Sequence, residues 1–320
     1  MTSGPSIVVG VRGEAGEDEV NRLIGAGAGE LFVGYVPGWW SDRFGFELSP
    51  NRRYRRPSQL TTRDRLAGIC RVAKARGVPV IVTLNEHFTT PAMWELEQRL
   101  IAEALDAGVQ GAVVADPSII GPLRARGLSR IHVSGEAGVY NRAFVEVLIA
   151  EGVSRVIFPR ELSLADIDRL ARRTAAAGLE SEVFAMGEPC VFDGARCFAE
   201  HGYGFAKDFC NDHLVKLVRR RTSGTESPVK SVALDQVASG PSVLELGKCG
   251  LCSLPALLAA GVTHLKVPGR ASMAEKGVRL LRAALQALES GPADLPALLG
   301  EPGLCASGGF CYHPEVRRGV

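Results

Sequence analysis

The sequence has no long hydrophobic run and little net charge, and each shortage excludes a class of protein. No apolar stretch reaches the roughly 18 residues that a membrane-spanning helix needs, so we expect no membrane span. The first residues lack the basic and then apolar pattern of a secretory signal, which predicts a cytoplasmic protein. The 320 residues carry a formal net charge of only +2, which argues against a dedicated polyanion-binding surface, and we expect no nucleic-acid partner.

Several motifs of hydrolases and nucleotide-binding folds are also missing. The chain contains no His-Glu-x-x-His metallopeptidase motif, and no cysteine and histidine are placed as a nucleophile and its base. Only one Cys-x-x-Cys pair is present, at Cys249 and Cys252, whereas a zinc ribbon normally has two. The spacing Gly10-x-x-Gly13 is too weak a glycine pattern for a dinucleotide-binding sheet. These absences disfavour a hydrolase and an open doubly wound sheet.

What the sequence does contain is a repeated alternation of strand and helix patterns. The predicted strands are Ser6–Arg12, Glu30–Val36, Val78–Glu86, Gly111–Pro117, Arg130–Ala137, Val153–Glu161, Leu179–Glu188 and Val262–Arg270. Their near-continuous apolar runs suit a parallel sheet that is covered on both faces. Eight such strands alternating with helices favour an α/β fold, a closed (β/α)8 TIM-like barrel over residues 1–291, followed by a tail over 292–320. A doubly wound sheet is the alternative.

Local signals mark where the intervening helices begin and end. Ser163-x-x-Asp166 resembles a capping box, in which the hydroxyl and the carboxylate bind free amides at a helix start. Glycines that can end a helix in the left-handed conformation stand before four of the strands, at Gly77, Gly108, Gly152 and Gly178.

Polar side chains end several predicted strands, as at Ser134 and Glu136. In a (β/α)8 barrel the carboxyl ends of the strands meet at one mouth, where polar residues are commonly catalytic or bind substrate. Carboxylates and histidine transfer protons, and a guanidinium binds a carboxylate or phosphate with two hydrogen bonds. The alternative for each residue singly is helix capping or loop hydrogen bonding. The catalytic candidates are Glu86, His87, Asp116 and Glu161, and the substrate-binding candidates are Asn85, Arg160, Lys266 and Arg270.

Cysteine placement is the most informative feature of the second half. In a reducing compartment, clustered cysteines indicate a metal or catalytic site before they indicate disulfides. An insertion over residues 188–252 separates the last two strands and carries Cys190, Cys197, Cys210 and Cys249. Thiolates bind zinc or iron–sulfur clusters, and spacing alone leaves both open. Cys305 and Cys311 in the tail form a second site or stay unbound, and Cys70 falls on an apolar helix face and is expected in the core.

Two motifs lie around the start of this insertion, Glu182-Val-Phe-Ala-Met-Gly-Glu-Pro-Cys190 and Asp193-Gly-Ala-Arg-Cys197. They resemble the patterns Glu-x-Phe-x-x-Gly-Ala-x-Cys and Ser-Gly-x-Cys, which are the signature of the collagenase-like peptidase family. Lys266-Val-Pro-Gly-Arg270 is similar to the family's Lys-Ile-Glu-Gly-Arg, with proline in place of the glutamate. Ser41-Asp42-Arg43 looks like an early family arginine and adds Arg43 to the substrate-binding candidates. The resemblance covers about residues 6 to 290.

The resemblance implies a barrel enzyme with a 4Fe–4S cluster held by Cys190, Cys197, Cys210 and Cys249. Better-understood members insert hydroxyl groups into ubiquinone precursors or RNA bases without dioxygen, with prephenate implicated as the oxygen source. The chain resembles the compact members, so a small anionic or aromatic substrate and a homo- or heterodimer are expected. The sequence around Cys210 departs from the family pattern, and Cys252 is an alternative to Cys210 or Cys249. A peptidase and a non-catalytic iron–sulfur partner subunit remain the alternative functions.

Overall fold

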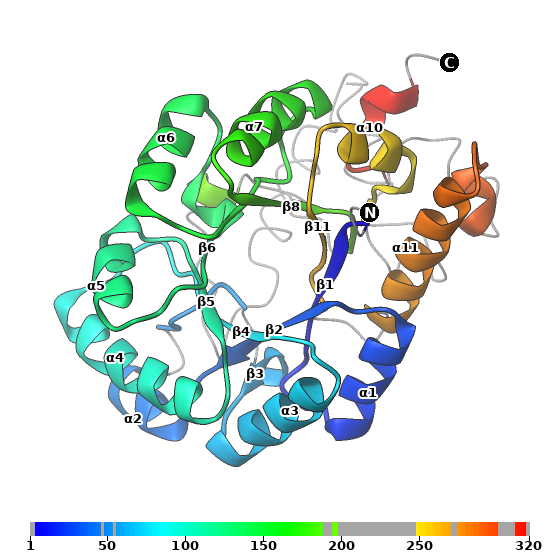
Figure 1. Cartoon of the computed structure of the whole chain (residues 1–320). Helices are drawn as coiled ribbons and strands as arrows, with labels where there is room; N and C mark the ends of the chain where they lie inside the picture. The colour runs from blue at the N-terminus through cyan, green and yellow to red at the C-terminus, as the bar shows by residue number, and fades with distance from the viewer. Residues whose placement is uncertain are drawn as a thin grey trace, which may run out of the picture.

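Eight parallel strands form a closed barrel in the computed structural model, which describes residues 4–45, 48–53, 56–187, 194–197, 248–269, 274–299 and 311–317 (Figure 1). The barrel strands are β1 Ser6–Gly10, β2 Glu30–Tyr35, β4 Val80–Leu84, β5 Gly111–Val114, β6 Ile131–Val133, β7 Arg155–Ile157, β8 Glu180–Phe184 and β11 His264–Val267. Because β1 pairs with both β11 and β2, the sheet has no open end. The predicted (β/α)8 barrel is confirmed, and each strand lies within its predicted range.

Helices surround this barrel on its outer side (Figure 1). They are α1 Glu17–Ala26, α2 Gly38–Phe44, α3 Arg63–Ala75, α4 Pro91–Asp106, α5 Ile120–Ala125, α6 Arg142–Glu151, α7 Leu164–Ala176, α10 Leu254–Ala259 and α11 Ala274–Glu289. The short strand β3 Gln59–Leu60 pairs with the end of β2 in parallel. The strands β9 Met186–Gly187 and β10 Lys248–Cys249 form a separate antiparallel pair. Among the described helices, none is both long and apolar enough to cross a membrane.

Short 3-10 helices lie in several of the connections. They are η1 Arg56–Ser58, η2 Pro117–Ile119, η3 Gly135–Ala137, η4 Gly194–Arg196, η6 Leu251–Ser253, η7 Leu295–Leu299 and η8 Pro314–Arg317. Two of them, η3 and η4, lie at the carboxyl side of the barrel, where η3 follows β6 directly.

The predicted helix signals correspond to actual helix ends. The amide of Asp166 donates to Ser163 Oγ at 3.2 Å at the start of α7, and the Ser163 hydroxyl donates back to the Asp166 carboxylate at 2.7 Å. The four glycines singled out before strands all have positive φ, between 69° and 103°. A residue with a side chain is strained in this conformation, which explains why glycine stands there.

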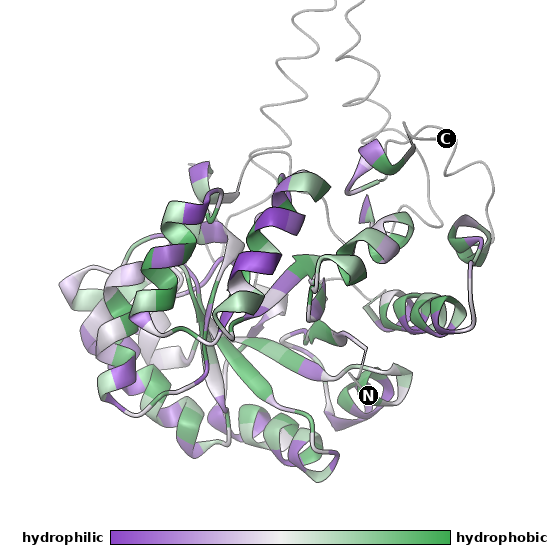
Figure 2. Ribbon diagram, turned by 45° about the horizontal axis from the view of Figure 1, so that its top comes forward, coloured by the Kyte–Doolittle hydropathy of each residue, from purple (hydrophilic) through white to green (hydrophobic). Residues whose placement is uncertain are grey.

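The hydrophobic core has two parts. The larger one lies between the barrel and the helices, and Cys70 is buried in it, as expected for a core cysteine. A smaller one fills the inside of the barrel with side chains that include Phe32, Ile81 and Phe184. Figure 2 accordingly shows hydrophobic strands surrounded by helices of mixed character. The aromatic stretch after β2 packs on the barrel, since Trp40 is fully buried and the Trp39 indole donates to Glu103 on α4 at 3.3 Å.

Candidate active site at the barrel mouth

A network of buried charges occupies the inside of the barrel below the mouth. Arg155 on β7 donates to both carboxylate oxygens of Glu30 on β2, at 2.6 and 2.9 Å, and to Glu182 on β8 at 2.9 Å. Lys266 on β11 donates to the other oxygen of Glu182 at 2.6 Å. All four side chains are buried. Lys266, a predicted substrate-binding residue, is therefore held in an internal ion pair.

The two carboxyl groups of this network respond differently to burial. Burial raises the pKa of Glu30, although Arg155 opposes the effect. Burial acts in the same direction on Glu182, but Lys266 and Arg155 together outweigh it and lower the pKa of Glu182 to about 2. Paired in this way, two carboxylates and two cations offset much of each other's desolvation cost.

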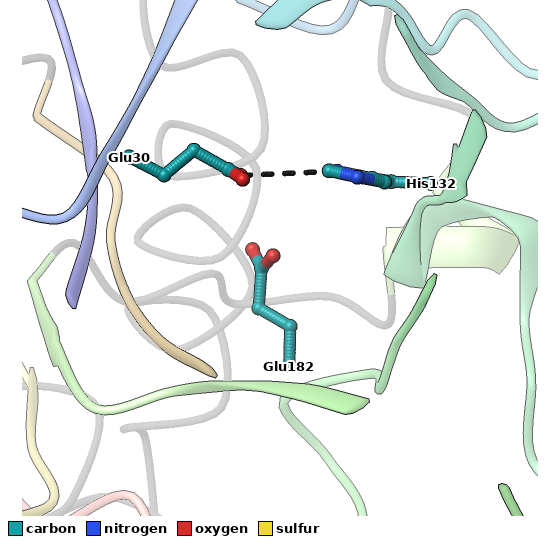
Figure 3. A group of neighbouring side chains, drawn as sticks. All are labelled: Glu30, His132 and Glu182. Carbon is teal, nitrogen blue, oxygen red and sulfur yellow. Dashed lines mark ion pairs between the residues drawn. The ribbon is translucent and has the colours of Figure 1, made fainter. Parts of the chain in front are cut away.

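His132 on β6 reaches the same network and forms a potential metal-ligand set with the two glutamates. Figure 3 shows Glu30, His132 and Glu182 pointing toward one another, with His132 Nδ1 at 3.8 Å from a Glu30 oxygen. One ligand atom from each lies within 4.8 Å of the others. The guanidinium of Arg155 already contacts both carboxylates. A divalent cation bound between them would therefore be repelled by this positive charge. We therefore assign the network to barrel stability and not to metal binding.

The mouth above this network holds a chain of hydrogen-bonded polar residues from two strand ends. Asn85, which follows β4, donates to Ser134 Oγ after β6 at 3.3 Å. Ser134 Oγ also accepts the backbone amide of Glu136 at 3.2 Å. The Glu136 carboxylate lies 3.4 Å from Nε2 of His87. Two strand-end segments that are about fifty residues apart in sequence thus meet at one site, as expected for a barrel mouth.

Two arginines give this site positive charge. Arg52 pairs with Glu86 at 3.3 Å, and its amide donates to Asn85 Oδ1 at 3.2 Å. Arg160 lies with its guanidinium 4.3 Å from the centre of the Phe184 ring. Burial would raise the pKa of Glu136, but the hydrogen bond from His87 and the charges of Arg160 and Arg52 lower it to about 2. Glu136 is therefore a carboxylate at any physiological pH.

The other predicted site residues lie elsewhere. Asp116 joins two loops, since its carboxylate accepts the amides of Ser118 at 2.9 Å and Thr89 at 2.7 Å, as the capping alternative describes. Glu161 is exposed, and Arg43 is exposed on α2. Arg270 lies outside the described residues. The structure therefore gathers Asn85, Glu86, His87 and Arg160 at the mouth, and the roles predicted for the three other described candidates stay predictions.

Several residues of the site and the network were missed as site residues in the sequence. Glu136 was recognised only as one of the polar strand ends. Arg52 lies in the long connection after β2, residues 37–57, which contains several arginines and gives no pattern that singles out this one. The buried charges Glu30 and Arg155 each begin a strand that otherwise lacks charged residues. Such a charge is a usable signal, because a charge in a strand covered on both faces needs a partner.

The predicted cluster ligands are partly within the described chain. Cys190 and Cys210 lie outside the described residues. Cys197 is buried and directly follows η4. This short helix packs against the mouth, because Gly194 lies so close to Glu136 that an added Cβ atom would be 2.8 Å from a carboxylate oxygen. Cys249 is half-buried on β10, opposite Met186 of β9. These thiols are suitable donors for zinc or an iron–sulfur cluster at the carboxyl rim of the barrel.

Glu97, a buried carboxyl behind the mouth, gives the protein a testable pH dependence. Its side chain on α4 is 1% exposed and accepts a hydrogen bond from Thr89 Oγ1 at 3.3 Å. Burial raises the pKa of Glu97 to about 8. The folded protein therefore keeps a proton that the unfolded chain releases at lower pH. The stability that this difference contributes is present below the ordinary carboxyl pKa and is lost as the pH rises.

We expect Glu97→Gln to remove this loss. Relative to wild type, the variant should gain at most about 1.4 kcal/mol of unfolding free energy per pH unit between roughly pH 5 and 8. Urea unfolding at pH 5, 6.5 and 8 measures the difference. Glu95→Gln, at an exposed position of the same helix, is the control and should follow wild type. A difference that stays constant over this range would contradict a raised pKa for Glu97.

Comparison with known proteins places this site in a family context. The family described as peptidase family U32 matches residues 17–296. The tRNA hydroxylation protein P1 of Bacillus subtilis (strain 168) is 28% identical over 205 residues, which are 62% of this chain and 46% of that protein. The tRNA hydroxylation protein P of Escherichia coli (strain K12) is 31% identical over 100 residues, 31% of this chain and 22% of that protein. The chain thus matches less than half the length of either relative.

A solved structure of a U32 peptidase is similar to the chain as a whole. It has a TM-score of 0.50 and 14% sequence identity, and the match covers 84% of this chain and 95% of that one. At this level of identity the similarity supports the barrel fold and carries no information about substrate or reaction.

Proposed function

The chain belongs to peptidase family U32, and from this premise we propose that it is a hydroxylase that acts on a base of tRNA at the barrel mouth. The observation that carries the proposal is the Asn85–Ser134–Glu136–His87 chain at the mouth, in a protein whose curated relatives are named for tRNA hydroxylation. The site combines a proton carrier, a fixed carboxylate and two arginines in one place.

The substrate predicted from the sequence has to be corrected. A small anionic or aromatic molecule was expected and a nucleic-acid partner was not, but both curated relatives are named as tRNA hydroxylation proteins. The prediction was wrong because it used the net charge of the whole chain and the resemblance to the compact members of the family. RNA binding depends on local contacts between arginine or lysine and phosphates, and a protein with a small net charge can still provide them.

Hydroxylation converts a C–H bond of the base into C–OH and removes two electrons from it. An organic oxygen donor, prephenate-type by the family resemblance, would give up the oxygen and take up these electrons. His87 would accept the proton that leaves the carbon and return it to the new oxygen, and the Glu136 carboxylate, 3.4 Å from Nε2, would keep the imidazole oriented. Arg52 and Arg160 would hold the carboxylate of the donor, because a guanidinium binds this group with two hydrogen bonds.

The rim also offers a surface for an RNA base. Phe88 follows His87 directly and is 51% exposed, although it is a large aromatic side chain. Proteins that bind single-stranded RNA stack unpaired bases on exposed aromatic rings. A base that leaves its stack could rest on Phe88 while its reacting carbon approaches His87.

Within the same proposal, Cys190, Cys197, Cys210 and Cys249 hold a 4Fe–4S cluster, which when bound supplies electron transfer beside the mouth. The supporting observation is the packing of η4, which ends next to Cys197, against Glu136.

Nucleoside analysis of a deletion strain tests the proposed function. Total tRNA from the strain should lack one hydroxylated nucleoside that the parent contains, as measured by liquid chromatography and mass spectrometry. Wild-type protein should restore the nucleoside, whereas Asn85→Ala should not, because it removes the link between the two halves of the mouth. Glu95→Gln serves as the control and should restore it. If deletion leaves every nucleoside unchanged and the purified protein cleaves peptides, the hydrolase alternative replaces this proposal.

A further inference from the structure

The C-terminal tail returns to the strand that carries Cys249. Cys311 forms an isolated parallel β-bridge with Cys249, and the amide of Tyr312 donates to the Cys249 carbonyl oxygen at 2.9 Å. Residues paired directly across neighbouring strands have their side chains on the same face of the sheet, and the strands themselves lie about 4.8 Å apart. The bridge therefore places two thiols next to each other at the rim of the barrel.

The tail is held there by contacts that do not involve a thiol. The Tyr312 ring lies 6.4 Å from the Phe184 ring, and its hydroxyl donates to the carbonyl oxygen of Gly187 at 3.4 Å. Lys248 Nζ donates to the carbonyl oxygen of Cys311 at 3.4 Å. Residues 311 and 312 are thus positioned by β8, β9 and β10 together, so the approach of Cys311 to Cys249 is built into the fold.

A buried histidine in the same tail lacks the partners that it should have. His313 is 3% exposed, and neither of its ring nitrogens has a hydrogen-bond partner in the described part of the chain. A carboxylate oxygen of Glu315 lies 4.0 Å from Nδ1, beyond hydrogen-bond distance. Buried polar groups almost always have a partner, so an orphaned imidazole two residues from Cys311 indicates a missing ligand.

We propose that the tail is part of the metal centre, with Cys311 supplying a thiolate next to Cys249 and His313 a nearby imidazole. The inference depends on the metal centre proposed above. Because four external ligands complete a 4Fe–4S cluster, Cys311 and Cys249 are alternative thiolates for one of its positions, with His313 beside them in the tail. Thiolate and imidazole are both established ligands of iron and zinc. Cys311 lies outside the region that resembles the family, which ends near residue 290, and for this reason the resemblance could not assign it.

Metal content and metal retention of the full chain test the proposal without an activity assay. The protein is purified anaerobically, and iron, zinc and sulfide are measured together with the absorption spectrum. Cys311→Ser should lose its metal to a chelator at least about 10-fold faster than wild type and should change the spectrum, since even outer residues of metal sites affect affinity by about 10–100-fold. Cys70→Ser, at a buried cysteine in the core under the helices, is the matched control and should retain its metal.

Three results would overturn the proposal. The first is Cys311→Ser with wild-type metal content, retention and spectrum. The second is a disulfide between Cys249 and Cys311 in the anaerobic protein, detected by peptide mass spectrometry. The third is wild-type protein that binds neither iron nor zinc. His313→Asn gives a second measurement, with metal loss faster than wild type, in case Cys311→Ser fails to fold. If Cys311→Ser loses its metal while a deletion strain keeps every hydroxylated nucleoside, the proposed function fails and the ligand assignment stands.

Discussion

Replacing Arg155 with methionine is expected to lower the free energy of unfolding by about 3–5 kcal/mol. Methionine has a similar length, but it leaves Glu30 and Glu182 buried with Lys266 as their remaining cation. Removing one partner of a buried ion pair is costly because the other charge keeps its desolvation penalty. Urea unfolding at pH 7, followed by circular dichroism, measures the change.

Arg172→Met is the matched control for this substitution. Arg172 pairs with Asp168 on the surface of α7 at 2.7 Å, where water screens both charges. We expect little change in stability, because solvent-exposed pairs contribute little. Equal effects of the two substitutions would mean that the network inside the barrel does not stabilise the fold.

The second large effect is expected at Glu136. Glu136→Gln should lower the rate of the proposed tRNA hydroxylation by about 10²–10⁴-fold, because glutamine keeps the shape but removes the charge that holds His87. With a pKa of about 2, Glu136 is too weak a base to take the proton itself, so its role is to position the imidazole. The fall should therefore appear in kcat, with KM for tRNA little changed.

Asp116→Asn is the control for Glu136→Gln, because the Asp116 carboxylate bonds loop amides and Glu136 contacts His87. Asp116 accepts the amides of Ser118 and Thr89, which an asparagine oxygen can retain in part. This variant should keep most of its kcat and lose some thermal stability. If Asp116→Asn reduced kcat as much as Glu136→Gln does, the result would support the catalytic role predicted for Asp116 from the sequence.

The fold could be predicted because its signal is repeated and local. Each strand of a parallel barrel is covered on both faces, so each appears as an apolar run, as in Val80–Leu84, and each helix brings its own capping residues. The helix start at Ser163 and the left-handed glycine at Gly152 depend only on neighbours in sequence. Interactions between residues close in sequence were therefore sufficient to predict the strands and the helix ends.

The site could be predicted only in part, because its contacts depend on closure of the barrel. That polar strand ends would meet at the mouth followed from topology, and Asn85 and His87 do meet Ser134 and Glu136 there. Which strand-end carboxylates would face the mouth did not follow, since Asp116 and Glu136 have the same kind of position in sequence. The Glu30–Arg155 pair joins residues 125 apart, and no local pattern indicates such a partner.

The antiparallel pairing of β9 with β10 has a consequence for how such proteins diversify. Gly187 and Lys248 are paired, so the chain leaves the barrel and returns to it at a single point. The number of residues between these two paired ends can therefore change without shifting the register of the eight strands, since a longer connection adds only a small closure entropy. Substitutions near Gly194, which packs against Glu136, would in contrast change the groups present at the mouth.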